Sequence, residues 1–299
     1  MFYFILLNSK IDIRKAYKVL ILFGIIISIQ CFWAFYLITS RGIASYFDLW
    51  YKSFFVIPIG GTNHIACVLI PLLIIGNRIL FGKKRIFYVF LLTVAIVLTK
   101  SRGGVVLTLF YFFVELFLNT QNRKKKTALI IVSLPLLAIG VFFFLSRDGL
   151  QVIQSFFRGF SSGKGTLNSF SSGRLALFKQ FLIYIGNHLL LGNGVSYDQL
   201  PVGSNGTHNV VLTILYENGL IGLMVYGIFA AVVFSRIRIY NEPNYNAQGL
   251  FSKTPAVVIL FIFINSMFEQ CLFTLSVDLI FLIMVRVLST NSDSLTMEK

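Results

Sequence analysis

The chain has 299 residues, of which 57% are hydrophobic and only 12% are charged, and its mean hydropathy is +0.81. Ordinary soluble domains are about 25% charged, so a cytosolic enzyme, a disordered chain and a coiled coil are all disfavoured. A net charge of +15 would suggest nucleic acid binding in a soluble chain. In a polytopic membrane protein, the charge first predicts which segments face the cytoplasm.

Apolar runs recur along the chain, and a helix needs about 20 apolar residues to cross a bilayer. The runs are residues 17–39, 54–76, 86–99, 103–118, 127–145, 208–234, 256–268 and 273–288. Residues 86–118 and 256–288 are each much longer than one crossing requires, so we expect each to form a helical hairpin. The sequence therefore predicts an all-α bundle of about eight transmembrane spans, forming a single integral membrane domain over residues 1–299.

The distribution of basic residues supports this topology. With eight spans and a cytoplasmic N-terminus, most of the 26 Lys and Arg residues fall in cytoplasmic segments, as the positive-inside rule requires. If residues 86–118 formed one span, the basic clusters at 83–85 and 123–126 would lie on opposite sides. We therefore expect a multi-pass protein with both termini in the cytoplasm.

One long extracytoplasmic loop, residues 146–207, is expected between the fifth and sixth runs. It is rich in Ser and Gly, and residues 174–191 within it have the apolar spacing of a helix. This helix is apolar enough to lie on the membrane surface or to close over a site. A loop of this length with its own helix is usually functional.

Two Ser-Arg motifs on the outward side are candidates for anion binding. Ser101 and Arg102 lie in the turn between two apolar runs, where a guanidinium is costly unless it is hydrated or has a function. The alternative is an exposed turn with a snorkelling Arg. Ser172 and Arg174 begin the loop helix, whose N-terminus favours an anion. The alternative there is an ordinary N-cap with a solvated Arg.

His208 and Asn209 open the sixth apolar run. In the first turn of a helix, the positive end of the helix dipole favours a neutral imidazole. A neutral imidazole can accept a proton from a hydroxyl. The alternative is an interfacial His without a chemical role.

Four carboxylates lie within or beside the predicted spans, and such acids are functional candidates by default. On a straight helix Glu217 points away from His208, so we expect it to make structural contacts. Glu269 and Asp278 bracket the last outward turn and could approach the site, and Glu115 is the fourth. No Asp-x-Asp pair is present, so no Mg²⁺ site for a sugar nucleotide is predicted.

Four segments carry a family resemblance, in a fixed order over roughly residues 55–285. They are Gly61–Ala66, Leu98–Gly104, Ser172–Arg174 with His188–Gly194, and His208–Asn209 with Glu217–Gly222. Together they resemble the motifs of the O-antigen ligase and polymerase superfamily of bacterial membrane proteins. The resemblance implies a helical bundle of the lipid-dependent glycosyltransferase type in the bacterial inner membrane. Family members have several more spans before this region, so we expect an N-terminally short member.

The resemblance also implies a reaction and a set of residues. The protein would move a glycan from an undecaprenyl diphosphate carrier to a hydroxyl of an acceptor glycan or lipid, without metal, cofactor or nucleic acid. Arg102 and Arg174 would hold the diphosphate as it leaves, and His208 would be the base on the acceptor side. The expected substrate-binding residues are Ser101, Ser172, Asn209, Lys164 and Glu269.

Several activities remain open. Within the family, the chain could be a repeat-unit polymerase of O-antigen or capsular polysaccharide, or an O-antigen ligase. A transporter or channel is the alternative from another class, and it predicts inverted repeats and helices broken within the membrane. The remaining alternative is a truncated membrane protein without catalytic activity.

Overall fold

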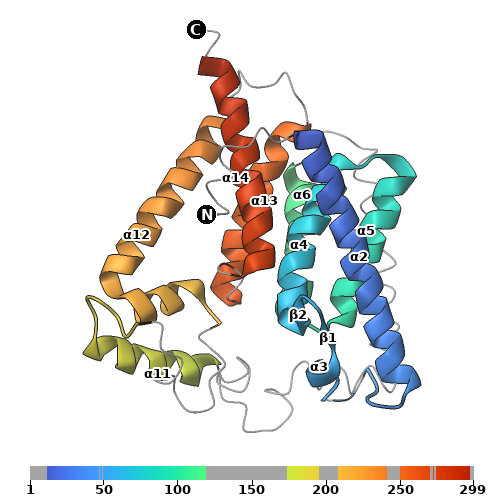
Figure 1. Cartoon of the computed structure of the whole chain (residues 1–299), viewed down its shortest axis with the longest axis horizontal. Coiled ribbons are helices and arrows are strands. Elements are labelled where there is room, and N and C mark those ends of the chain that lie inside the picture. Colours follow the sequence, from blue (N-terminus) through green and yellow to red (C-terminus); the bar gives the residue numbers. More distant parts are fainter. Residues whose placement is uncertain are drawn as a thin grey trace. The chain divides into compact units, whose positions relative to one another are not determined.

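The computed structural model describes residues 12–46, 48, 50–118, 174–194, 208–240, 250–269, 272 and 274–296. The chain divides into two compact units (helices labelled in Figure 1). The N-terminal unit comprises residues 20–166, and the C-terminal unit comprises residues 167–299 together with residues 1–19. The predicted span 127–145 and the loop before residue 174 lie outside the described residues.

Helices dominate the described part of the N-terminal unit. In chain order the elements are α2 (Ile13–Ser40), α3 (Tyr51–Phe54), β1 (Val56–Ile57), β2 (Gly60–Gly61), α4 (Thr62–Ile79), α5 (Gly82–Leu98) and α6 (Arg102–Leu118). The two strands pair antiparallel, with Val56 opposite Gly61. α2 covers the first predicted run. In the second run, the long helix α4 begins only at Thr62, because the end of α3 and the two strands occupy the first residues of the run.

Residues 86–118 form two helices, as predicted. Lys100, between α5 and α6, has a φ of 57°. This left-handed conformation cannot continue a right-handed helix, so the chain turns there.

α4 and α6 run parallel and in contact near both ends. A Cβ atom on Gly104 of α6 would lie 2.7 Å from the Cβ of Ala66 on α4. Near the other ends, Arg78 of α4 pairs with Glu115 of α6. Small residues allow such close helix packing inside membranes.

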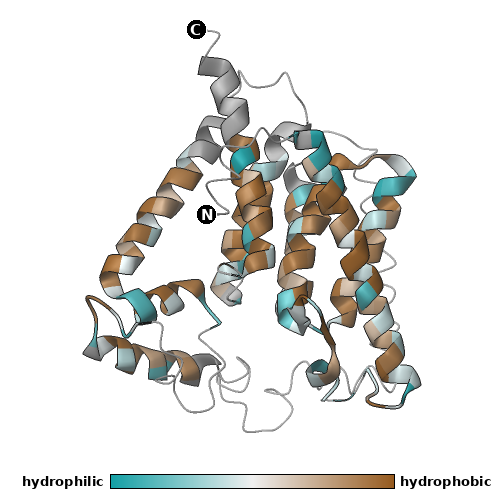
Figure 2. Ribbon diagram, in the orientation of Figure 1, coloured by the Kyte–Doolittle hydropathy of each residue, from teal (hydrophilic) through white to brown (hydrophobic). Residues whose placement is uncertain are grey.

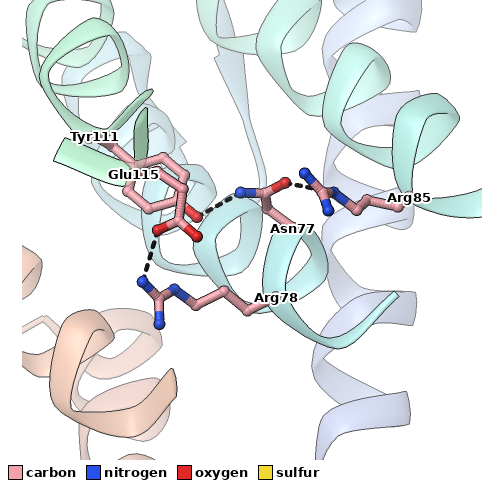
Figure 3. Close-up of polar contacts among 5 residues, drawn as sticks. All are labelled: Asn77, Arg78, Arg85, Tyr111 and Glu115. Carbon is pink, nitrogen blue, oxygen red and sulfur yellow. Dashed lines mark hydrogen bonds and ion pairs between the residues drawn. The ribbon is translucent and has the colours of Figure 1, made fainter. Parts of the chain in front are cut away.

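A buried polar network joins the C-terminal halves of α4 and α6 to the N-terminal end of α5 (Figure 3). Nη2 of Arg78 lies 2.6 Å from Oε2 of Glu115, and these side chains are only 8% and 6% exposed. Asn77 donates to the hydroxyl of Tyr111 (2.7 Å) and accepts a hydrogen bond from Nε of Arg85 (2.9 Å). Buried charges require such partners, so Glu115 has a structural role here.

The described part of the C-terminal unit contains four helices. They are α11 (Arg174–Asn187), α12 (Val210–Tyr240), α13 (Leu250–Phe268) and α14 (Leu275–Thr296). α11 confirms the helix predicted within residues 174–191, and α13 and α14 confirm two helices within residues 256–288. Phe181 and Ile185 of α11 pack on Tyr216 of α12 in a buried cluster.

α12 is broken at Gly219, whose φ of 61° and ψ of −160° are not helical. A break leaves carbonyls before it and N–H groups after it without helical partners. The segment 189–194 binds these groups. Its N–H groups at 193 and 194 donate to the carbonyls at 216 and 217, over 2.7 and 2.9 Å. Its carbonyls at 189 and 190 accept from the N–H groups at 220 and 221, over 2.9 and 3.3 Å.

Two glycines make this backbone contact possible. A Cβ atom on Gly192 would lie 2.5 Å from the carbonyl of Glu217, and one on Gly219 would overlap the backbone of Leu190. Both glycines have positive φ values, of 75° and 61°. The expected structural contact of Glu217 is therefore made by its backbone carbonyl.

Within the described residues, three helices are long and apolar enough to cross a membrane: Arg14–Ser40, Thr62–Ile79 and Val210–Ser235. Figure 2 shows apolar residues along much of each helix. After its break, α12 exposes large apolar side chains at residues 221, 224, 225, 228 and 232. Such a surface suits contact with lipid.

Replacing Glu115 by Ala should lower the melting temperature of the detergent-solubilised protein. The change leaves the Arg78 guanidinium buried without its carboxylate, which typically costs about 3–5 kcal/mol. Removing both charges, with Arg78→Met and Glu115→Leu, should recover much of the loss. Lys83→Ala, at an exposed position of α5, is the control. A wild-type melting temperature for E115A would contradict the role of this ion pair.

Gly192→Ala and Gly219→Ala should each destabilise the C-terminal unit, because the new methyl group collides with backbone atoms at a positive φ. Faster limited proteolysis of purified protein is the measurement. Gly227→Ala lies in the same helix, where an added Cβ would meet nothing within 4 Å, so it should be as stable as wild type or slightly more so. Equal sensitivity of all three variants would refute the proposed packing.

Candidate functional site

Asn209 forms the start of α12. Its Oδ1 accepts a hydrogen bond from the N–H of Leu212 (3.0 Å), which is the N-cap arrangement that satisfies a free N–H group in the first turn. Its Nδ2 donates to the carbonyl of Met267 near the end of α13 (2.9 Å). Asn209 therefore joins the start of one helix to the end of another and holds the adjacent His208 in place.

The sequence predicts His208 in the first turn of a helix, but in the structure it precedes α12, which begins at Val210. Its φ of 53° is left-handed, a conformation that His adopts more readily than most non-glycine residues. Nδ1 of the ring lies 2.8 Å from Oε1 of Glu269, which follows α13. The two side chains are 30% and 18% exposed, so the pair is partly buried but accessible.

Glu269 determines what the imidazole of His208 can do. An ionised carboxylate only accepts hydrogen bonds, so in the neutral imidazole the proton lies on Nδ1 and the lone pair on Nε2. In a catalytic triad, a carboxylate orients the histidine in this way, and the histidine acts as the general base. The sequence suggested that the helix dipole would favour the neutral form of this imidazole. In the structure, the direct contact on the ring is made by the carboxylate of Glu269.

The partnership of His208 and Glu269 was not anticipated, although both residues were candidates. Glu269 was expected to bind substrate, and in the structure its carboxylate contacts an imidazole 61 positions away in the chain. The one signal in the sequence is that both residues lie at the ends of apolar runs. Asp278, the other acid expected nearby, lies in the first turn of α14.

The turn at Ser101, which the sequence predicts on the outward side of the membrane, is buried within the described part of the chain. Lys100 and Ser101 are both buried. Oγ of Ser101 accepts a hydrogen bond from the N–H of Gly104 (3.3 Å), which makes Ser101 the N-cap of α6. Arg102 is the first residue of α6 and is partly buried.

Two helix N-termini meet beside Arg102. α4 begins at Thr62, and the packing of Ala66 against Gly104 holds its first turns next to those of α6. The positive ends of both helix dipoles favour an anion at this end. The segments Gly61–Ala66 and Leu98–Gly104, which are separate motifs in the sequence, therefore lie together in the structure.

The remaining candidates are placed only in part. Arg174 begins α11, whereas Ser172 and Lys164 lie outside the described residues. The structure brings His208, Asn209 and the carboxylate of residue 269 together within the C-terminal unit. Ser101 and Arg102 belong to the N-terminal unit. Over the described ranges, no three His, Cys, Asp or Glu side chains gather as a metal site would require.

A model of a protein family described as O-antigen ligase matches residues 87–227. No curated protein matches the chain. The matched region runs from α5 past the break in α12 and includes Arg102 and His208. The match and the apolar helices together indicate an integral membrane protein. Because the matched region contains three of the four segments that carry the sequence resemblance, it supports the membership of this chain in the O-antigen ligase superfamily.

Proposed function

We propose that the protein transfers a glycan from an undecaprenyl diphosphate carrier to an acceptor hydroxyl, as a repeat-unit polymerase or as an O-antigen ligase. The family match supports a membrane role in joining glycans. The His208–Glu269 pair carries the proposed reaction type, because it leaves Nε2 of a partly exposed imidazole as a proton acceptor.

In the proposed reaction, Nε2 of His208 takes the proton of the acceptor hydroxyl as that oxygen attacks the anomeric carbon. A new carbon–oxygen bond forms while the bond from the same carbon to the diphosphate oxygen breaks. The diphosphate leaves with the bonding electrons and gains negative charge. The Glu269 carboxylate stabilises the imidazolium that results.

The leaving diphosphate requires fixed positive charge. The Arg102 guanidinium, at the positive ends of the α4 and α6 dipoles, is suited to this role. We assign Arg174, at the start of α11, to the same diphosphate. The proposed substrate-binding residues remain Ser101, Ser172, Asn209 and Lys164, whereas Glu269 now acts by positioning the base.

The break in α12 bears on the transporter alternative, because transporters often contain broken helices. In transporters the unpaired backbone groups at such breaks line the substrate path. Here the backbone groups at 216, 217, 220 and 221 are bound by the segment 189–194. This closed break favours a structural role over a substrate path.

The activity test uses a strain that lacks this gene, complemented with variants and analysed for surface glycan. His208→Ala should reduce glycan transfer by about 10²-fold or more, as expected for loss of a general base. Glu269→Gln should reduce it less, because the imidazole remains but loses its anionic partner. Arg102→Ala and Arg174→Ala should also impair transfer.

Matched controls are His188→Ala and Arg41→Ala, since both side chains are exposed and neither has a proposed role. Full glycan transfer by H208A, R102A and R174A would overturn the assignment. The product also separates the two activities, because a polymerase lengthens the glycan on its carrier whereas a ligase moves it to a different acceptor.

We further propose about eight spans in the bacterial inner membrane, with both termini cytoplasmic and the residues of the proposed reaction on the outer side. Fusions of a periplasm-active reporter after Ser162 should be active, and fusions after Lys125 should be inactive. Equal activity at both positions would rule out this topology.

A further inference from the structure

Two tyrosines between α2 and α4, Tyr46 and Tyr51, form hydrogen bonds with the C-terminal end of α5. The last four carbonyls of a helix have no helical partner. Here the carbonyls at 95 and 96 accept from the N–H of Thr99, and the carbonyl at 97 accepts from the N–H of Lys100. The hydroxyl of Tyr46 also donates to the carbonyl at 97 (2.9 Å), and that of Tyr51 donates to the carbonyl at 98 (3.1 Å). All four carbonyls are thereby satisfied.

The two tyrosines are held independently of these hydrogen bonds. Their rings pack edge to face with centroids 5.2 Å apart, and Tyr51 is fully buried. Phe35 packs against Tyr46, and Phe55 packs against Tyr51. Burial raises the pKa of Tyr46 to about 12 and also raises the pKa of Tyr51, so both hydroxyls remain hydrogen-bond donors at neutral pH.

Lys100, in the turn after α5, contacts the same segment of the chain as the two tyrosines. Its Nζ donates to the backbone carbonyl of Asp48 (3.1 Å) and lies 5.5 Å from the centroid of the Tyr46 ring. Lys100 is also the left-handed residue that turns the chain from α5 into α6. A strained conformation of this kind persists when the surrounding contacts determine it.

We infer that Tyr46, Tyr51 and Lys100 are positioning residues for Arg102. Their contacts fix the end of α5 and the turn after it, and Arg102 follows Lys100 by two positions. The tyrosine hydroxyls bond to backbone carbonyls, so they act on the diphosphate of the lipid carrier only through the placement of Arg102. This inference rests on the function proposed above, in which Arg102 binds the diphosphate.

Removing the two hydroxyl oxygens tests the inference while retaining the aromatic packing. For Tyr46→Phe with Tyr51→Phe in nanodiscs, the Kd of undecaprenyl diphosphate should rise roughly tenfold, the scale expected for two lost hydrogen bonds. The Kd of Arg102→Ala should rise at least as much. In the triple variant the Kd should match that of R102A, because the tyrosines act through this one residue.

The controls distinguish a displaced Arg102 side chain from a loss of stability of the whole protein. Tyr36→Phe, at a tyrosine that is 58% exposed on α2, should bind like wild type. The melting temperature should stay near wild type for Tyr46→Phe alone, because the carbonyl at 97 keeps its bond from the N–H of Lys100. This single variant should still raise the Kd, and it replaces the double variant if the latter does not fold.

The outcomes distinguish the two proposals. A wild-type Kd for R102A would overturn the diphosphate-binding role of Arg102. A raised Kd for R102A, combined with a wild-type Kd for the tyrosine variants, would overturn the positioning role alone. An additive loss in the triple variant would also overturn it, because the tyrosines would then act independently of Arg102.

Discussion

The structure depends on one constraint: backbone groups at a helix end or break within apolar surroundings must be bound by the protein, because lipid offers no hydrogen bonds. The protein meets this constraint in three ways. Tyrosine hydroxyls bind the end of α5, the Asn209 amide caps the start of α12, and the backbone of residues 189–194 binds the break in that helix. Two of these three places adjoin a proposed catalytic residue, Arg102 or His208, so the contacts that satisfy the backbone also place those residues.

Two carboxylate pairs show that the exposure of the side chains distinguishes a structural contact from one that can act on a substrate. Glu115 and Arg78 are almost completely buried and join helices within one unit. Glu269 and His208 have a similarly close contact but remain partly exposed, so the imidazole can meet a substrate. Both pairs obey the rule that a charge in an apolar setting requires a partner, and accessibility decides which pair could act on another molecule.

The small residues of the recognised motifs have a packing explanation. Ala66 and Gly104 allow α4 and α6 to approach closely, and Gly192 and Gly219 allow the 189–194 segment to reach the broken helix. These residues pair in space across motifs that are far apart in sequence. In this chain, the small residues of these motifs make close packing contacts, while the polar residues beside them carry the proposed chemistry.

The sequence by itself predicted the long helices that the structure describes, because apolar runs and their polar interruptions are local signals. It located the turn after α5, the helix α11 and the candidates Arg102 and His208. Only the tertiary structure decided that Glu269 contacts His208, that the hydroxyls of Tyr46 and Tyr51 bind the end of α5, and that α12 breaks at Gly219. Each of these outcomes depends on a hydrogen bond or a steric contact between distant segments, and local periodicity carries no information about which distant segments meet.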